Sequence, residues 1–566
     1  MPDTHGSKPG WGRLFAALRH RKTAYMLIFG FAAGLPYALL LGTLYAWLSD
    51  AQVNLETMGV FSLIGLAYAF KFLWSPALDR INLPVLRRLG RRKQWISTAQ
   101  FLLGAVLVTL ATLNPQSALG WFSLLAGLGA FASATQDVVI DAWRVDVADD
   151  VATIEILSTI YQMGYRIAAL VGGALALFMA ERLGWPAVYA WMGAIMLAVA
   201  FASLFAPENA ESADDRAANV AGLAELREKG ELSPKVRGMA LGAVGTLWAW
   251  ALITVGVFMV RSLGSDPENR PDAVAFIAGQ GPLIVLATVV IPSIIAAWLV
   301  RLKRLGHHVL QAPVASRGWA DSLLDHGYRA LLLPLAEMIG RLGWAAILVL
   351  GLVLSYRITD SIWGSFAYPF YLGELQYSKD EVAVASKFFG VGALMVGLAL
   401  GGILFTWLGR MPVLTIGAVT AALTNLLYAD LARGGEVMQL VSDASGFTFL
   451  IAQLGADERM GRLMVAIAGE NIAGGLAGAA FVAYLSSIVS KNYSAVQYAL
   501  LSSLTLLIGT LGRGALGRMI EVQGYFTVFL FTTAIGGVAV VLCLAEWWRT
   551  TRKGDDTRTP LQPSAP

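Results

Sequence analysis

The chain has 566 residues, of which 57% are hydrophobic and only 14% are charged. Soluble domains carry about 25% charged residues, so this composition excludes an ordinary soluble protein and indicates a polytopic membrane protein. The formal net charge of +4 is too small to favour a nucleic-acid partner, and the single cysteine, Cys543, excludes an intrachain disulfide and a cysteine metal cluster.

Apolar stretches long enough to cross a bilayer, which takes about 20 residues each, recur along the whole chain. They predict six membrane-spanning helices, then two after a polar stretch, then six more. The predicted spans are 24–48, 57–78, 95–113, 119–143, 154–180, 186–206, 239–260, 275–300, 344–372, 381–407, 412–431, 462–488, 496–518 and 525–547. The first is too long for the apolar core of a signal peptide and lacks a clear cleavage site, so we expect it to be retained.

This order predicts an all-α fold of two six-helix bundles with two extra helices between them, about 14 transmembrane helices in total. Large secondary transporters are built from two such halves. We expect an N-terminal bundle over 1–206, a cytoplasmic linker with the two inserted helices over 207–343, a C-terminal bundle over 344–548 and a flexible cytoplasmic tail over 549–566. The polar segment 434–459 is predicted to be a long loop.

The distribution of Lys and Arg between loops predicts the topology. Basic residues gather in 80–93, in 301–341 and after 548, whereas the loops 49–56 and 373–380 are neutral to acidic. Because cytoplasmic loops carry the excess of positive charge, we expect both termini in the cytoplasm of a multi-pass inner-membrane protein.

Motifs for enzyme chemistry and for nucleotide hydrolysis are missing from the sequence. No Lys follows a Gly, so the chain has no G-x-x-x-x-G-K-[ST] phosphate loop, and it has neither an H-E-x-x-H zinc helix nor a G-x-S-x-G elbow. We therefore expect a protein that is not an enzyme, that needs no metal or cofactor, and that draws on an ion gradient.

Charged residues inside the predicted spans are the remaining candidates for chemistry. Each costs at least ~2.5 kcal/mol near the bilayer centre, so each needs a partner or a function. Four are basic and four acidic, which suits mutual pairing: Lys71, Asp137, Asp141, Arg166, Arg357, Asp360, Lys387 and Glu470.

Helix depth sharpens these expectations. Asp137 and Arg166 lie at similar distances from the turn near Val151 and are predicted to pair, either as a static salt bridge or as a moving, proton-linked one. Glu470 lies near mid-depth, where burial favours a protonated carboxyl, and is predicted to carry a proton. Arg357 has two possible partners, Glu470 or its near neighbour Asp360.

One sequence motif in two parts resembles a signature of known transporters. "FKFLWSPALDR" (70–80) with "GRRK" (90–93) resembles the loop signature of the major facilitator superfamily, in which Asp and Arg residues latch the two halves on the cytoplasmic side. Asp79, Arg80, Arg91 and Arg92 match that latch motif. Ser75 replaces its opening Gly, and extra residues separate its two parts.

Five further strings resemble the AmpG muropeptide permease family: "GFAAGLP" (30–36), "ASATQDVVIDAWRVD" (132–146), "GYR" (164–166), "ENIAGGLAGAAFVAYLSS" (470–487) and "YSAVQYALLSSL" (493–504). The resemblance implies a proton-coupled importer of anhydro-muropeptides by alternating access across the bacterial inner membrane. The expected partners are then this substrate, protons and the lipid bilayer, and the expected state is a monomer.

The resemblance and the buried charges together give two sets of candidate site residues. The proton-coupling candidates are Glu470, Asp137, Asp141 and Asp360. The substrate-binding candidates are Gln136, Arg166, Arg357, Lys387, Asn471 and Gly34.

Other functions stay open on the sequence alone. The inserted helix pair and the segment 434–459 are not part of the AmpG pattern, and major facilitators with fourteen helices often export solutes. The alternatives are therefore a proton-coupled exporter, an importer of another solute such as a drug, peptide or siderophore, and a sensor or membrane enzyme built on a transport fold.

Overall fold

The computed structural model describes residues 11–52, 63–84, 86–207, 231–264, 271–306, 309–310, 327–357, 366–367, 369–453, 455 and 457–552. Within these residues, eleven helices are long and apolar enough to cross a membrane, or twelve if the bent pair Ala330–Leu342 and Ala345–Ser355 forms one span. The all-α polytopic fold is therefore confirmed. The count of fourteen stays a prediction, because the predicted spans 57–78 and 344–372 run into residues outside the described ranges.

The N-terminal half contains the helices α1 (Trp11–Leu18), α2 (Arg21–Ala38), α3 (Leu44–Asp50), α5 (Leu63–Ala69), α6 (Ser75–Arg80), α7 (Lys93–Ala111), α8 (Leu119–Val147), α9 (Ile154–Leu170), α10 (Ala176–Leu183) and α11 (Trp185–Ser203). Short 3-10 turns form η3 (Lys71–Leu73) and η4 (Arg87–Leu89), and π turns form η1 (Leu39–Thr43) and η5 (Val171–Leu175). Pro36 has no N–H to donate and precedes η1, where the helical hydrogen-bond register widens.

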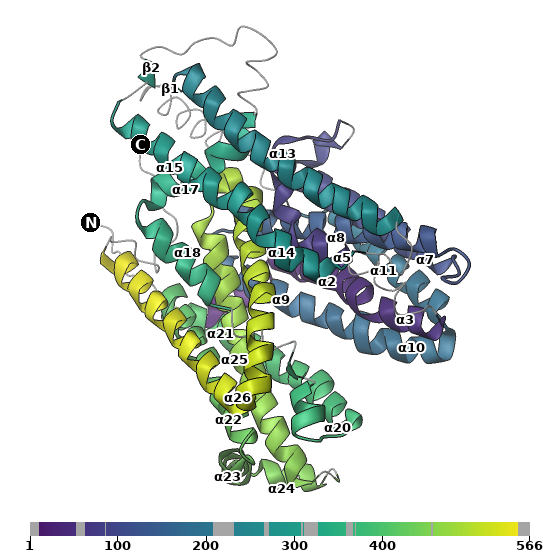
Figure 1. Cartoon of the computed structure of the whole chain (residues 1–566). Coiled ribbons are helices and arrows are strands. Elements are labelled where there is room, and N and C mark those ends of the chain that lie inside the picture. The colour runs from purple at the N-terminus through teal and green to yellow at the C-terminus, as the bar shows by residue number, and fades with distance from the viewer. Residues whose placement is uncertain are drawn as a thin grey trace.

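The linker between the halves contains α13 (Pro234–Gly264), α14 (Ala273–Val285), η7 (Leu286–Val290), α15 (Ile291–Arg304), η8 (Tyr328–Leu332) and α17 (Leu333–Leu342). Two short strands, β1 (Glu231–Leu232) and β2 (Val309–Leu310), pair antiparallel at the end of this pair of helices, with Glu231 opposite Leu310. Figure 1 shows α13 beside α15, and the two helices are in contact.

The C-terminal half contains α18 (Ala345–Ser355), η9 (Pro369–Glu374), α20 (Lys379–Ala383), η10 (Val384–Phe389), α21 (Gly390–Leu408), α22 (Arg410–Leu431), α23 (Glu436–Ala444), α24 (Phe447–Gln453), α25 (Glu458–Ile488), η11 (Lys491–Tyr493) and α26 (Ser494–Arg552). The long α26 breaks at Gly524, whose φ of 76° only glycine adopts without strain. Asp457 caps α25 by accepting a hydrogen bond from the Met460 N–H at 2.8 Å.

Helix packing within each half depends on close backbone contact. A β-carbon on Gly30 of α2 would lie 2.1 Å from the Tyr161 carbonyl oxygen of α9, and one on Gly397 of α21 would lie 2.1 Å from the Ile472 carbonyl oxygen of α25. Only glycine allows helices to approach this closely, as small residues do in membrane helix pairs.

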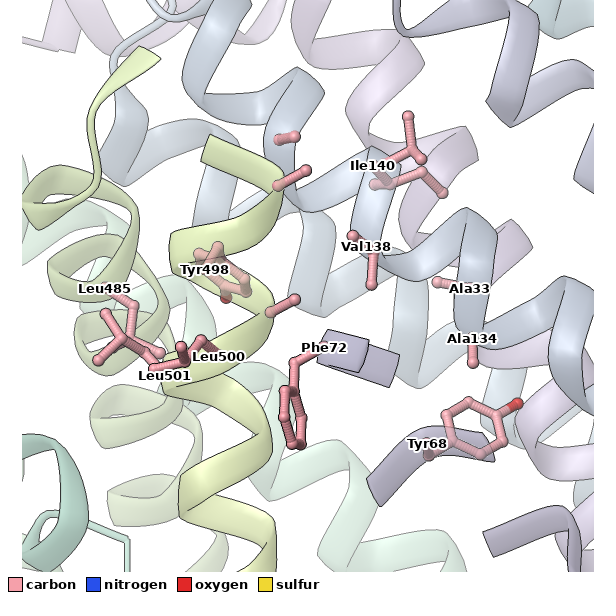
Figure 2. Close-up of a cluster of buried hydrophobic side chains, with 14 of the residues drawn as sticks. Ala33, Tyr68, Phe72, Ala134, Val138, Ile140, Leu485, Tyr498, Leu500 and Leu501 are labelled. Atoms are coloured by element: carbon pink, nitrogen blue, oxygen red, sulfur yellow. The ribbon is translucent and has the colours of Figure 1, made fainter. Parts of the chain in front are cut away.

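The two halves meet along an apolar interface. Helix α26 packs against α8, and α9 packs against α21 and α25. Figure 2 shows side chains of α26 beside those of α8, with Phe72 of η3 between them; the labelled residues are Ala33, Tyr68, Phe72, Ala134, Val138, Ile140, Leu485, Tyr498, Leu500 and Leu501.

The inserted helices lie against both halves. Helix α14 contacts α5 of the N-terminal half and α26 of the C-terminal half. The ring of Trp248 in α13 also packs edge-on against Phe72, with 6.3 Å between ring centroids. The inserted pair therefore bridges the helices that would separate if the halves moved apart.

The segment predicted as a long polar loop, 434–459, contains the helices α23 and α24. The prediction weighed its charged residues and missed a helical apolar pattern in Val437, Leu440 and Val441, all of which are exposed.

Candidate functional site

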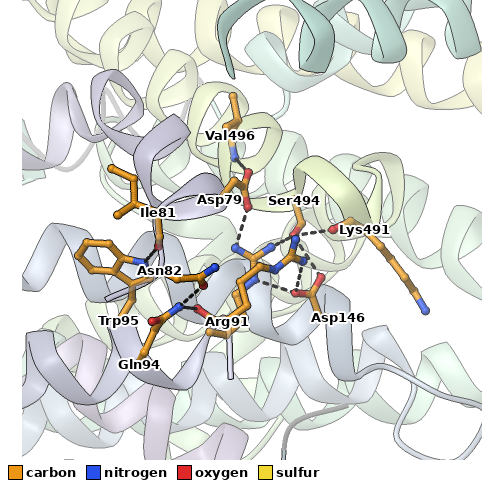
Figure 3. A network of polar contacts seen from close by, with 11 residues as sticks. Asp79, Ile81, Asn82, Arg91, Gln94, Trp95, Asp146, Lys491, Ser494 and Val496 are labelled. Atoms are coloured by element: carbon orange, nitrogen blue, oxygen red, sulfur yellow. Dashed lines mark hydrogen bonds and ion pairs between the residues drawn. The ribbon is translucent and has the colours of Figure 1, made fainter. Parts of the chain in front are cut away.

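A buried polar network joins the two halves at one end of the bundle (Figure 3). Arg92, at the start of α7, donates to Asp79 at 2.7 Å, to Asp146 at 2.7 Å and to the Ser494 hydroxyl at 2.9 Å. Asp79 in turn accepts from the Val496 N–H at 3.1 Å. Because Ser494 and Val496 begin α26, we call this network the latch and its side of the molecule the latch end.

The latch has two physical components. The Asp79 carboxylate satisfies an N–H in the first turn of α26, where helix N–H groups lack partners and the helix dipole favours negative charge. Burial alone would lower the pKa of the Arg92 guanidinium, but Asp146 and Asp79 outweigh burial, so the pKa lies above its ordinary value and Arg92 stays charged. Of the predicted latch residues, Asp79 and Arg92 lie at its centre, and Arg91 contacts Asp146 at 3.3 Å from a more exposed position.

A second ion pair crosses between the halves near the latch. Arg410 begins α22, and its Nε and Nη2 both donate to Glu155 Oε1 of α9, at 2.8 and 2.6 Å. Sequence reasoning missed this pair. The two residues are 255 positions apart, and each lies at a helix end where a charge needs no special account.

Four charged side chains form a cluster in the N-terminal half. Lys71 of η3 is ion-paired with Asp137 of α8, and Asp137 also accepts a hydrogen bond from the Tyr161 hydroxyl at 2.8 Å. One turn further along α8, Asp141 accepts from Arg144 Nη2 at 2.8 Å. The ion pair of Asp137 is thus with Lys71 and not with Arg166, because equal helix depth does not specify how each helix is rotated.

Arg144 is a functional candidate that the sequence reasoning missed. Its side chain is fully buried, and its Nε donates to the Ser486 hydroxyl of α25 at 3.0 Å. The rings of Tyr161 and Tyr498 each lie with their centroids 5.1 Å from the guanidinium carbon. The i, i+3 spacing to Asp141 in the sequence was the available signal.

Arg166 lies beside an aromatic group. Its guanidinium carbon is 6.0 Å from the centroid of Tyr165, and Tyr165 is 6.1 Å from the half-exposed Tyr37. Tyr37 packs edge-on against Tyr68 at 5.2 Å. Aromatic rings beside a cation can bind both sugar faces and anionic groups.

Two predicted residues lie against α2 and α9. Gln136 is fully buried, its amide donates to the Ala32 carbonyl at 2.6 Å, and its Oε1 has no hydrogen-bond partner among the described residues. Gly34 lets α2 approach α9, since a β-carbon there would lie 2.5 Å from the Tyr165 carbonyl oxygen. The structure thus gives Gly34 a packing role.

Arg357 lies where the halves meet. A β-carbon placed on Gly478 of α25 would be 3.3 Å from Arg357 Nη1 and 3.6 Å from Gln162 Nε2 of α9. A cation from one half and an amide from the other thus meet over a glycine that leaves them room.

Glu470 belongs to a separate group in the C-terminal half. It accepts a hydrogen bond from the Tyr428 hydroxyl, whose oxygen is 2.8 Å from that of Tyr371. The neighbouring Asn471 donates to the Ile467 carbonyl at 2.9 Å within α25. The structure therefore separates Glu470, with its tyrosine partners, from the charge cluster of the N-terminal half.

Some predicted positions lie outside the described residues. Asp360 is among them, and so are the side chains of Lys387 and Arg80. Within the described part of the chain, no group of three or more His, Cys, Asp or Glu side chains is placed to hold a metal ion.

Comparisons with known proteins identify relatives among transporters and permeases. The family model described as acetyl-coenzyme A transporter 1 matches residues 23–181. The anhydromuropeptide permease of Escherichia coli K12 is 28% identical over 540 residues, covering 94% of this chain and 82% of that protein. Putative transporter AmpG 4 of Rickettsia conorii is 25% identical over 519 residues, covering 92% of this chain and 95% of the relative.

Two solved structures share the fold. The major facilitator proton:xylose symporter XylE bound to 6-bromo-6-deoxy-D-glucose matches with a TM-score of 0.50 at 12% identity, covering 95% of each chain. A double tryptophan mutant of XylE matches with a TM-score of 0.52 at 13% identity and the same coverage. The resemblance to the AmpG-type permeases and the major facilitator fold are both confirmed.

Proposed function

We propose that this chain, a multi-pass transporter of the major facilitator fold similar to the AmpG-type permeases, imports anhydro-muropeptides across the bacterial inner membrane by proton symport. The observation that carries the proposal is the similarity to an anhydromuropeptide permease along 94% of the chain. Proton coupling, direction and sidedness are parts of the proposal.

The chemistry of the site fits a substrate with sugar rings and carboxylates. Tyr37, Tyr165 and Arg166 form an aromatic and cationic surface, suited to a sugar face beside an anionic group. Arg357 and Gln162 offer a second cation and an amide at the junction of the halves. A lactyl or peptide carboxylate would bind such a cation by charge-assisted hydrogen bonds.

Proton coupling requires carboxyl groups that change partner within the membrane. Asp137 and Asp141 lie next to each other in the charge cluster, and Glu470 lies with Tyr428 in the other half. We assign proton carriage to these carboxylates. The latch end is assigned to the cytoplasm, because its loop is rich in Arg and because the basic ends of α15 and α26 belong to predicted cytoplasmic segments.

The test is uptake into proteoliposomes that contain the purified protein. Labelled N-acetylglucosaminyl-anhydromuropeptide is supplied outside with an inward proton gradient, and again after an ionophore has collapsed the gradient. We expect saturable accumulation that depends on the gradient and is competed by unlabelled fragment. Saturable uptake without gradient dependence would refute proton coupling and would leave the substrate assignment standing.

The family match over 23–181 makes acetyl-coenzyme A a second candidate substrate. It shares anionic groups and amides with a muropeptide but lacks the aminosugar pair, so it is the appropriate competitor in the same assay. Competition by acetyl-coenzyme A and none by muropeptide would reverse the substrate assignment. Efflux in cells that express the protein would instead support an exporter.

A further inference from the structure

Arg144 differs from Lys71 and Asp137, its neighbours in the charge cluster, in that residues of both halves contact it. Asp141 of its own helix accepts from Nη2, and Ser486 of α25 accepts from Nε. Its third nitrogen, Nη1, has no hydrogen-bond partner among the described residues. The guanidinium is thus held by one carboxylate, one hydroxyl from the opposite half and two tyrosine rings.

The charge balance of this cluster depends on Asp141. Among the described residues, the cluster contains two positive groups, Lys71 and Arg144, and two carboxylates, Asp137 and Asp141. The other titratable groups near the cluster, among the described residues, are the phenols of Tyr161 and Tyr165 from α9, Tyr68 from α5 and Tyr498 from α26; α25 contributes the neutral Ser486. A proton on Asp141 would leave one buried positive charge without a counterion.

We propose that the buried Asp141–Arg144 pair is a proton-sensitive lock at the latch end: the halves stay closed while Asp141 is ionised, and a proton on Asp141 favours their separation. An unpaired guanidinium is expensive to keep out of water, whereas the ion pair is tolerated when its geometry is good. Neutral Asp141 therefore favours separation of α8 from α25 and α26, which lets water reach Arg144. The inference rests on the proposed transport function only in assigning this step to proton symport.

A cysteine pair can report the contact between the halves without any substrate. A β-carbon on Gly402 of α21 would lie 3.8 Å from the Thr159 β-carbon of α9, which matches the mean β-carbon separation of a disulfide of about 3.8 Å. Thr159 follows Glu155 by four residues, so the pair reports on the latch end. The parent protein carries Thr159→Cys and Gly402→Cys with the buried Cys543 replaced by Ser.

The experiment measures the oxidative cross-linking rate of this parent and of three variants. Asp141→Asn mimics the protonated carboxyl, and we expect cross-linking about tenfold slower or more. Adding Arg144→Gln to Asp141→Asn removes the unpaired charge, so the double variant should recover most of the parent rate. Ser486→Ala, which removes one hydrogen bond and no charge, should slow cross-linking much less.

The pH dependence gives a second and independent readout. Each rate is divided by that of the Asp141→Asn/Arg144→Gln double variant at the same pH, because the thiolate fraction of the cysteines falls with pH in every variant. In the parent this ratio should fall as the pH falls, because Asp141 takes up a proton and leaves Arg144 unpaired. In Arg144→Gln the sign reverses: an ionised Asp141 is then the unpaired charge, so the ratio should rise as the pH falls.

The outcomes separate the lock from the proposed function. Parent-like cross-linking in Asp141→Asn, no recovery in the double variant, or the same sign of pH dependence in the parent and Arg144→Gln would each overturn the lock. All variants are first checked by size-exclusion chromatography, and only monodisperse protein is compared. If Asp141→Asn misfolds, the comparison of pH dependence between the parent and Arg144→Gln decides. Failure of muropeptide uptake with the expected cross-linking pattern would refute the substrate and leave the lock standing.

Discussion

Replacing Asp79 with alanine should open the latch end without unfolding either half. The carboxylate makes one bond to the charged Arg92 and one to the Val496 N–H of the opposite half. Only the bond to Val496 joins opposite halves, and a hydrogen bond to a charged group contributes about 1.5–3 kcal/mol. Arg92 keeps Asp146 at 2.7 Å, so no charge is left unpaired.

The closed state should therefore lose about 1.5–3 kcal/mol relative to the open state, which is about 10- to 150-fold in the equilibrium between them. Val496 is 5% exposed, so a cysteine there reports opening through its rate of labelling by a maleimide, again with Cys543 replaced by Ser. We expect Asp79→Ala to raise the labelling rate of Val496→Cys by at least tenfold.

The matched control is Asp149→Ala, which removes an aspartate that pairs with Lys22 within the same half at 2.6 Å. It should leave the labelling rate within about twofold of the parent, because a surface ion pair contributes only about 0–1 kcal/mol and this one joins no elements of opposite halves. Equal labelling of the two variants, or no increase with Asp79→Ala, would refute the reasoning that these bonds hold the halves together.

Three further predictions follow from contacts described above. Glu155→Ala should raise the rate of latch-end opening in the same labelling assay. The swap Glu155→Arg with Arg410→Glu should return that rate to the parent value, because it forms the ion pair with its charges reversed. A swap that does not lower the rate would contradict a direct contact. Gly30→Ala should lower the unfolding temperature or prevent folding, because it meets a backbone oxygen at 2.1 Å, whereas Gly42→Ala, with nothing within 4 Å, is the neutral control. Glu470→Gln should abolish gradient-driven accumulation in the uptake assay while substrate binding persists; full uptake would remove its coupling role.

The fold could be predicted because its signals are local. Each span is recognisable as about 20 consecutive apolar residues. The cost of burying charge identified Lys71, Asp137 and Asp141 as candidates from the sequence alone. The latch residues Asp79 and Arg92 came from a motif that matches in part, since Ser75 replaces its opening Gly and extra residues separate its two parts. The confirmed all-α fold required only that each helix form where its own sequence favours it.

The contacts that could not be predicted depend on how each helix is rotated about its axis and on partners far away in the sequence. Depth along α8 and α9 suggested Arg166 for Asp137, but the rotation of the helices brings Lys71 to it instead. Arg144 lies near the end of α8, where a charged residue is expected at the membrane interface and needs no buried partner. In the structure it is buried and contacts Ser486 of α25 and Tyr498 of α26. No local pattern encodes a neighbour that lies 342 residues further along the chain.

The inserted helices give the protein a mechanical link to its bilayer. Helix α14 touches both α5 and α26, and it continues through the π turn η7 into α15. If the halves rock apart as the proposed function requires, this pair would have to bend or slide within the lipid. Membrane thickness would then influence the proposed transport cycle, because a mismatch between apolar helices and the bilayer has a free-energy cost.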